Sequence, residues 1–86
     1  MIGSFKDKQA VISESNPDAL FADGFEEALI GCVCYAGRTV PVYNRAKCIE
    51  ILQLEMSEEE ADEYFEFNVQ GAWVGENTPM FLNLFV

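Results

Sequence analysis

The chain has 86 residues, of which 50% are hydrophobic and 13% aromatic, so it can fill a core and does not have the composition of a disordered segment. Its 15 acidic and 5 basic residues give a formal net charge of −10, which argues against direct binding of nucleic acid or an anionic membrane, because affinity for phosphate needs clustered Lys and Arg. The sequence contains no His, which excludes imidazole-based catalysis and His-ligated metal sites.

The N-terminal part of the chain predicts little regular structure. Before the first predicted helix, only Val11–Ile12 has the pattern of a short strand. Asn16 followed by Pro17 is typical of a helix start, since Asn caps helices and Pro suits the first helical position. We therefore predict a short helix over Ser15–Phe21, ended by a turn at Asp23–Gly24.

A β-hairpin is predicted next. Ala28–Tyr35 is a continuous apolar run, so both of its faces should be covered, as in a central strand or a strand at a subunit interface. Ala36–Thr39 has the composition of a turn, and Val40–Tyr43 returns as the second strand. Pro41 cannot donate a ladder hydrogen bond, which places the second strand at an edge or Pro41 at an unpaired position.

Two helices should follow the hairpin. Asn44 can cap a helix over Arg45–Glu55, and Ser57 with Glu60 has the spacing of a capping box that starts another helix. Gly71 suits a left-handed residue after the end of that second helix. Its predicted inward-facing positions, which share one side of a helix, are Ala61, Tyr64, Phe65, Asn68 and Val69.

The chain closes with the apolar segment Met80–Val86, which is far shorter than the roughly 20 residues of a membrane helix and predicts a strand. Together these elements predict an α+β fold, in which a small antiparallel sheet of the hairpin and C-terminal strands packs against two or three helices. We expect residues 1–86 to form a single domain.

The compartment is predicted from two features. Met1–Ala10 is a polar mixture without the apolar region of a secretory signal. Cys32, Cys34 and Cys48 are an odd number of thiols, which we expect to be reduced in the cytosol.

The second predicted helix carries four acids on one side, namely Glu59, Asp62, Glu63 and Glu66. Four like-charge neighbour pairs result, which together cost about 1–2 kcal/mol on an isolated helix. Three interpretations stay open: the acids form a solvated face, they meet Arg45 and Lys47 of the preceding helix, or they bind a basic partner, in the extreme case as a mimic of a phosphate backbone.

Enzymatic chemistry finds little support in the sequence. The three Cys lack the C-x-x-C spacing of structural zinc sites, so we expect no metal and no cofactor. Glu76 beside the predicted C-terminal turn is a candidate acid–base group, although 15 acids supply many accidental pairs and we assign no catalytic residue. Trp73 is either a core anchor or a partner-binding residue.

Three segments of the chain resemble a known family. Asp23–Gly31, Ala46–Leu52 and above all Glu59–Phe81 are similar to small proteins encoded by tailed bacteriophages and prophages, whose members share a segment close to Y-F-E-F-N-x-x-G-A-W-V-G-E-x-T-P. The resemblance implies a phage origin and a location in the cytoplasm of an infected bacterial host. It implies no biochemical function and no catalytic residues.

We therefore expect a small acidic accessory protein that acts by binding a host or phage protein and forms a homodimer. The expected partner is a protein, basic if the acidic face binds it, and the candidate contact residues are Glu59, Asp62, Glu63, Glu66, Trp73 and Glu76. The alternatives are a small carboxylate enzyme, with or without a divalent cation, and a minor virion component.

Overall fold

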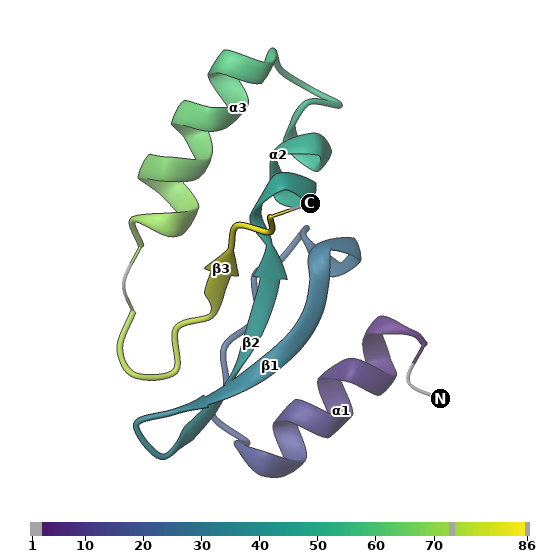
Figure 1. Cartoon of the computed structure of the whole chain (residues 1–86), viewed down its shortest axis with the longest axis vertical. Coiled ribbons are helices and arrows are strands. Elements are labelled where there is room, and N and C mark those ends of the chain that lie inside the picture. The colour runs from purple at the N-terminus through teal and green to yellow at the C-terminus, as the bar shows by residue number, and fades with distance from the viewer. Residues whose placement is uncertain (1–2, 73, 86) are drawn as a thin grey trace.

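The computed structural model describes residues 3–72 and 74–85 (Figure 1). In chain order, the elements are α1 (Phe5–Ser15), the 3-10 turn η1 (Glu26–Ala28), β1 (Leu29–Tyr35), β2 (Arg38–Asn44), α2 (Arg45–Leu52), α3 (Glu58–Phe65), the π-helix η2 (Glu66–Gln70) and β3 (Met80–Leu82). Within these described residues, three α-helices accompany a three-stranded sheet, which confirms the predicted α+β class. Trp73, a predicted contact residue, and Val86 lie outside the described residues.

The first helix, α1, ends where the sequence predicted a helix to begin. Because α1 occupies Phe5–Ser15, the strand predicted at Val11–Ile12 and the helix predicted over Ser15–Phe21 are both wrong. Asn16 closes α1 instead of starting the next helix, since Pro17 disfavours helical backbone at the residue that precedes it.

Asn16 also ties the end of α1 to two distant segments. Its buried side-chain amide donates to the backbone oxygen of Thr39 in β2 and to Oδ1 of Asn77 in the loop before β3, both at 2.9 Å. Its own Oδ1 accepts a hydrogen bond from the N–H of Asp18 at 3.1 Å. Both polar atoms of this buried amide are therefore satisfied, as buried amides require.

β1 and β2 form the predicted antiparallel hairpin. The turn between them consists of Ala36 and Gly37, with φ angles of +53° and +80°. Left-handed backbone at both central residues is the pattern of a type I′ turn, whose twist matches that of the two strands. The pairing runs from Tyr35 opposite Arg38 at the turn to Leu29 opposite Tyr43 at the far end.

The strand order β1-β2-β3 places β2 at the centre of the described sheet. β3 runs parallel to β2, so the sheet is mixed, and the prediction of an antiparallel sheet is wrong for β3. β1 lies at an edge, with its side chains exposed beyond Leu29, so the first of its two predicted positions, a central strand, is wrong, while a strand at a subunit interface stays a prediction. Pro41 lies in the central strand, opposite Cys32 and outside the segment that pairs with β3, which agrees with an unpaired position and not with an edge strand.

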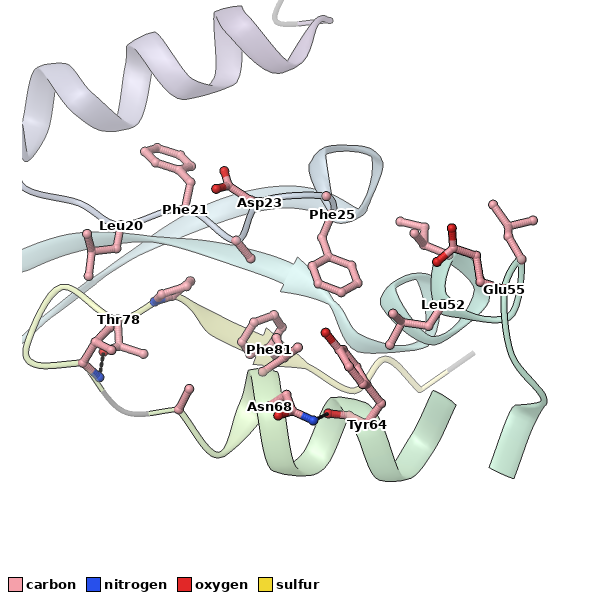
Figure 2. A pocket seen from close by; sticks show the side chains of 18 residues that line it. Leu20, Phe21, Asp23, Phe25, Leu52, Glu55, Tyr64, Asn68, Thr78 and Phe81 are labelled. Carbon is pink, nitrogen blue, oxygen red and sulfur yellow. Dashed lines mark hydrogen bonds between the residues drawn. The ribbon is translucent and has the colours of Figure 1, made fainter. Parts of the chain in front are cut away.

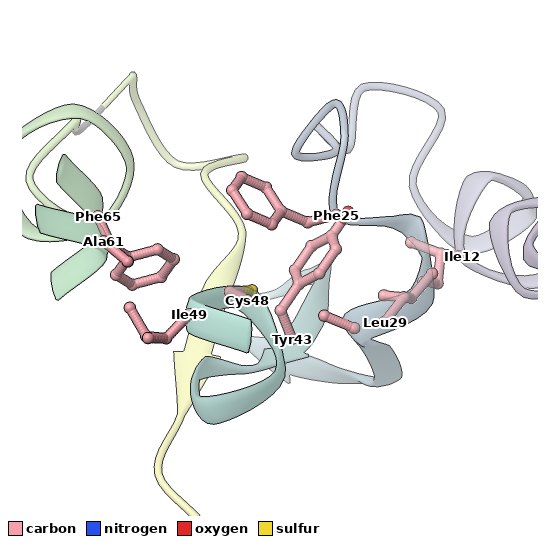
Figure 3. Close-up of a cluster of buried hydrophobic side chains, with 9 residues drawn as sticks. Ile12, Phe25, Leu29, Tyr43, Cys48, Ile49, Ala61 and Phe65 are labelled. Atoms are coloured by element: carbon pink, nitrogen blue, oxygen red, sulfur yellow. The ribbon is translucent and has the colours of Figure 1, made fainter. Parts of the chain in front are cut away.

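The hydrophobic core gathers where β2, α2 and α3 meet the segment before β1 (Figure 3). Tyr43 and Phe65 are its two largest fully buried side chains. The Phe65 ring stands edge-on to the rings of Phe25 and Phe81, with centroid separations of 6.2 and 5.0 Å. The Tyr43 hydroxyl accepts a hydrogen bond from the N–H of Ala22 at 2.9 Å, while burial raises the pKa of Tyr43 to about 12.

α3 begins as predicted and ends differently. Ser57 Oγ accepts a hydrogen bond from the N–H of Glu60 while Glu60 Oε1 accepts one from the N–H of Ser57, which confirms the capping box. After Phe65 the helix continues as the π-helix η2, and Gly71 has a φ of −78°, so the predicted left-handed residue is wrong. The N–H of Gly71 donates to the backbone oxygen of Glu66 at 2.9 Å, and a Cβ at Gly71 would lie 2.7 Å from that oxygen. Glycine is needed there for close approach of the backbone.

Candidate partner-binding groove

A groove of about 740 Å³ opens between segments that are far apart in the sequence (Figure 2). Residues 20–25, which precede η1, line one side of it. Tyr64 and Asn68 line it from the α3 and η2 side, and Phe81 of β3 lies between the two sides. The end of α2 contributes Leu52. The groove therefore combines parts of the chain that only the tertiary fold brings together.

Large apolar side chains make up most of the groove and continue onto its rim. Phe25 and Phe81 extend from the core into the lining. Leu54 and Val74 also line the groove and are 84% and 61% exposed. Folded domains rarely leave a contiguous group of large apolar side chains in solvent unless that surface binds something. A concave site with such a lining is suited to an apolar ligand or protein segment.

Tyr64 belongs to this groove and not to the core. The sequence predicted Tyr64 and Phe65 to face inward together, and this is correct for Phe65 alone, because Tyr64 is 45% exposed. Asn68, which was also predicted to face inward, is exposed, and its amide donates to the backbone oxygen of Tyr64 at 3.2 Å. No described segment covers this part of the helix, so the apolar face that the sequence predicted as buried is partly open.

Carboxylates flank the apolar lining. Asp23 and Glu55 are among the residues that line the groove (Figure 2). A smaller hollow adjoins it, because Tyr64 and Asn68 line both, and this hollow adds Glu63 and the exposed ring of Phe67. An apolar centre with acids at its margin is suited to a ligand that is itself apolar on one side and basic at the edges. The acids that flank the apolar lining are Asp23, Glu55, Glu60 and Glu63.

Arg45 of α2 contacts two of the four acids that share one side of α3 and its continuation. Its Nη2 lies 3.2 Å from Asp62 Oδ1 and 3.9 Å from Glu66 Oε1. Its Nε donates to Gln70 Oε1 at 3.2 Å, and its guanidinium carbon lies 5.2 Å from the centre of the Phe65 ring. The interpretation in which the acids meet the preceding helix is therefore correct for Asp62 and Glu66, and the cation is Arg45.

The other two acids of this face remain available. Among the described residues, neither Glu59 nor Glu63 has a cationic nitrogen within 4.0 Å, and Lys47 forms no ion pair with the helix. Glu63 is the one that faces the groove margin, in the hollow next to Tyr64. The four acids thus divide into a pair that contacts Arg45 of α2 and a solvated pair, of which Glu63 lines the hollow beside the groove.

Glu76 lies apart from the α3 acids. It occupies the loop before β3, where its Oε2 is 2.7 Å from Arg38 Nε at the start of β2. Both side chains are largely exposed, so this ion pair contributes little to stability. The structure does not bring Glu76 together with Glu59, Asp62, Glu63 and Glu66, which all belong to α3 and the first residue of η2.

The three thiols lie in two different environments. Cys32 and Cys34 are exposed on β1, whereas Cys48 of α2 is buried in the core. Burial raises the pKa of Cys48 to about 11, so this thiol stays protonated and unreactive near neutral pH. Within residues 3–72 and 74–85, the structure contains no group of three or more His, Cys, Asp and Glu side chains that could hold a metal ion.

The comparisons with known proteins add no family or fold relative. A scan against models of protein families and searches of curated proteins and of solved structures found no match to this chain. Among the described residues, no helix is both long enough and apolar enough to cross a membrane.

Sequence reasoning missed most of the groove. Leu54 of the groove and Phe67 of the adjoining hollow do not lie on the apolar sides of the two helices predicted there. This position was the one available signal that both side chains are exposed. Asp23 was assigned to a turn and Glu55 to a helix end, and neither gave a signal of its own. Their proximity depends on contacts between distant segments.

Proposed function

We propose that this protein acts by binding another protein and that the groove receives an amphipathic segment of the partner, apolar on one side and basic along its margins. The observation that carries the proposal is the large apolar lining, which continues onto exposed side chains such as Leu54 and is flanked by Asp23, Glu55 and Glu63. Amphipathic helices commonly bind in apolar grooves of this kind.

Charge supports a basic partner over a neutral one. The net charge of −10 creates a negative field around the whole molecule, which accelerates the approach of a basic protein and disfavours acidic competitors. Glu63 has no cationic partner among the described residues, so its charge is available at the groove margin. Arg45 forms ion pairs with Asp62 and Glu66, so these two acids contribute to the negative field of the molecule and not to direct contact with the partner.

The same lining favours binding over carboxylate catalysis. An acid–base enzyme needs several carboxylates that converge in a concave site. Among the described residues, the groove is lined by two, Asp23 and Glu55, within a mainly apolar surface. The resemblance to phage proteins supports a host or phage protein as the partner, met in the cytoplasm of an infected bacterium.

The experiment uses a designed probe, a synthetic helical peptide with Leu on one face and Lys on the other. We expect saturable binding that weakens as salt is added, because the charges at the margin are screened. A peptide of the same pattern with Glu in place of Lys should bind far more weakly.

Two matched variants distinguish binding in the groove from attraction by the negative charge of the whole molecule. Leu54→Gln alters an exposed rim residue and should weaken the peptide at least about fivefold, or roughly 1 kcal/mol. Val11→Gln alters an exposed apolar residue of α1 outside the groove and should leave the affinity unchanged. Equal effects of the two variants would show that the groove is not the binding site, and equal binding of the Lys and Glu peptides would show that the acids at its margin do not select a basic partner.

A further inference from the structure

β1 is an edge strand that is protected at its start, where Lys8 Nζ of α1 donates to the backbone oxygen of Leu29 at 3.0 Å, but not along the rest of its length. Residues 29–35 read LIGCVCY and include no charged residue and no Pro. Beyond Leu29 every side chain of the strand is exposed, including Ile30 and Tyr35. Natural sheet edges are generally blocked by Lys, Pro, bulges or a covering segment, because an open edge pairs with other strands. Here the pairing irregularity between Leu29 and Gly31 affects the start of β1 alone.

The outer backbone groups of β1 can be identified from its register. Tyr35 closes the two-residue turn in a hydrogen-bonded pair, and such pairs alternate with non-hydrogen-bonded ones along an antiparallel ladder. Val33 and Gly31 therefore direct their N–H and C=O groups toward β2. Cys32 and Cys34 direct theirs away from it, and among the described residues no other segment bonds to them. An extended strand is the occupant that satisfies such a row of groups.

We infer that the occupant is a second copy of the same chain, with β1 pairing antiparallel to β1 of its partner about a two-fold axis at Val33. This inference does not depend on the proposed function, since no residue of β1 lines the groove. The two three-stranded sheets then join into one continuous sheet, and each copy keeps its groove.

The register follows from side-chain shape. With the axis at Val33, Tyr35 of each copy lies opposite Gly31 of the other. The space above Gly31 is open, since a Cβ built there has no described neighbour within 4 Å. Tyr35 is 64% exposed, so its ring is free to cover that space. Aromatic side chains across from strand glycines stabilise sheets in this way.

The same register places Cys32 of one copy opposite Cys34 of the other, in a pair whose backbone groups face each other as hydrogen bonding requires. An axis at Cys32 also satisfies the backbone groups, but it places Gly31 opposite Val33. An axis at Cys34 satisfies them as well, but it leaves Gly31 without a partner-strand residue opposite it. The Val33 axis is therefore the register that gives Gly31 an aromatic partner.

The pairing of Gly31 with Tyr35 selects a second copy among the strands that the edge could accept, because one two-fold axis forms this pair twice. Two chains of charge −10 repel each other, and β1 is a stretch where they can approach without setting charge against charge. Added salt should therefore strengthen the dimer, which is the opposite of the effect expected for a basic ligand in the groove. The opposite salt responses keep the two proposals separable.

The test uses a bis-alkylating reagent that joins directly opposed thiols, with Cys34→Ser and Cys32→Ser variants that each retain one β1 thiol. Directly opposed residues of a hydrogen-bonded pair have Cα atoms about 5.5 Å apart, within reach of the reagent. We expect a covalent dimer when the two variants are mixed and none from either variant alone. Using single-thiol variants also removes the link that could form between Cys32 and Cys34 of one strand, and Cys48 is buried and unreactive.

A second variant tests the dimer without cysteine chemistry. Val33→Glu alters a side chain that is exposed in a single copy, but in the dimer it sets two like charges directly opposite each other at the two-fold axis. We expect it to retain the circular dichroism and the thermal stability of the folded chain at low concentration and to raise the dimer dissociation constant at least about tenfold in sedimentation experiments. Cross-linking of either thiol variant alone would overturn the register. A wild-type chain that stays monomeric at high concentration and high salt would overturn the dimer.

Discussion

The buried amide of Asn16 links three segments of the chain through hydrogen bonds. Its side chain satisfies the backbone oxygen of Thr39 and Oδ1 of Asn77, and it is the buried polar residue of the described core region. Asn16→Ala leaves those oxygens without their donor, so we expect the free energy of unfolding in urea to fall by about 1–3 kcal/mol. Ser15→Ala removes the neighbouring exposed hydrogen bond to Thr39 and should change the free energy of unfolding by about 0.5 kcal/mol or less. Equal losses would contradict this role of Asn16.

Gly71 provides a second prediction at the residue scale. A Cβ there would come within 2.7 Å of the backbone oxygen of Glu66, so Gly71→Ala should strain η2 and lower the free energy of unfolding by about 1–3 kcal/mol. The matched control is Gly31→Ala, for which no described atom lies within 4 Å of the new Cβ and no loss is expected. Urea unfolding at low protein concentration measures both. A harmless Gly71→Ala would show that η2 relaxes easily.

The buried Tyr43 and Cys48 predict sensitivity to alkaline pH. Their pKa values rise from 10.0 to about 12 and from 9.0 to about 11, chiefly through burial. Above pH 9 the unfolded chain therefore releases a proton that the folded chain retains, and the free energy of unfolding falls as pH rises. Each group contributes up to about 1.4 kcal/mol per pH unit between its two values. Urea midpoints measured across this range should decline, and the decline above pH 10 should be shallower in Tyr43→Phe.

At the scale of elements, α3 depends on its neighbour α2 to offset its own charge. Arg45 contacts Asp62 and Glu66 and stacks on Phe65, which limits repulsion among the acids. We expect Arg45→Gln to lower the free energy of unfolding by about 1 kcal/mol in low salt and by less in high salt. Lys47→Gln, which removes the same charge without breaking a described ion pair, should have a smaller effect. A loss that does not change with salt would assign the role of Arg45 to packing alone.

Some elements with local signals were predictable, although α1 was missed despite its N-cap at Ser4, and features defined by distant contacts were not predictable. Ser57 and Glu60 lie three residues apart, so their capping box is visible in the sequence. The hairpin is visible too, although its turn is Ala36–Gly37 and not the predicted Ala36–Thr39, because Arg38 and Thr39 belong to β2. Asn16 was ambiguous because an Asn before Pro is compatible with the end of one helix and the start of another. The edge position of β1 could not be predicted, since a strand's neighbours are not encoded in its own residues.

At the scale of the whole molecule, the groove is a product of topology. The parallel placement of β3 beside β2 brings Phe81 next to the segment of residues 20–25, opposite Tyr64. Each of these segments contributes neighbouring residues to the groove, but the segments are far apart in the sequence, so no local pattern revealed the site. The apolar content of the sequence predicted a core, and the structure shows that part of it is exposed instead.

The central claim is that the groove, and not the acidic face as a whole, recognises a partner. The most direct measurement is a titration of isotope-labelled protein with the Leu/Lys helical peptide, followed by backbone amide chemical shifts. The account predicts the largest changes at Phe25, Leu54, Tyr64 and Phe81, with small changes along β1. Changes confined to Glu59, Asp62 and Glu66, or spread evenly over the acidic residues, would contradict it.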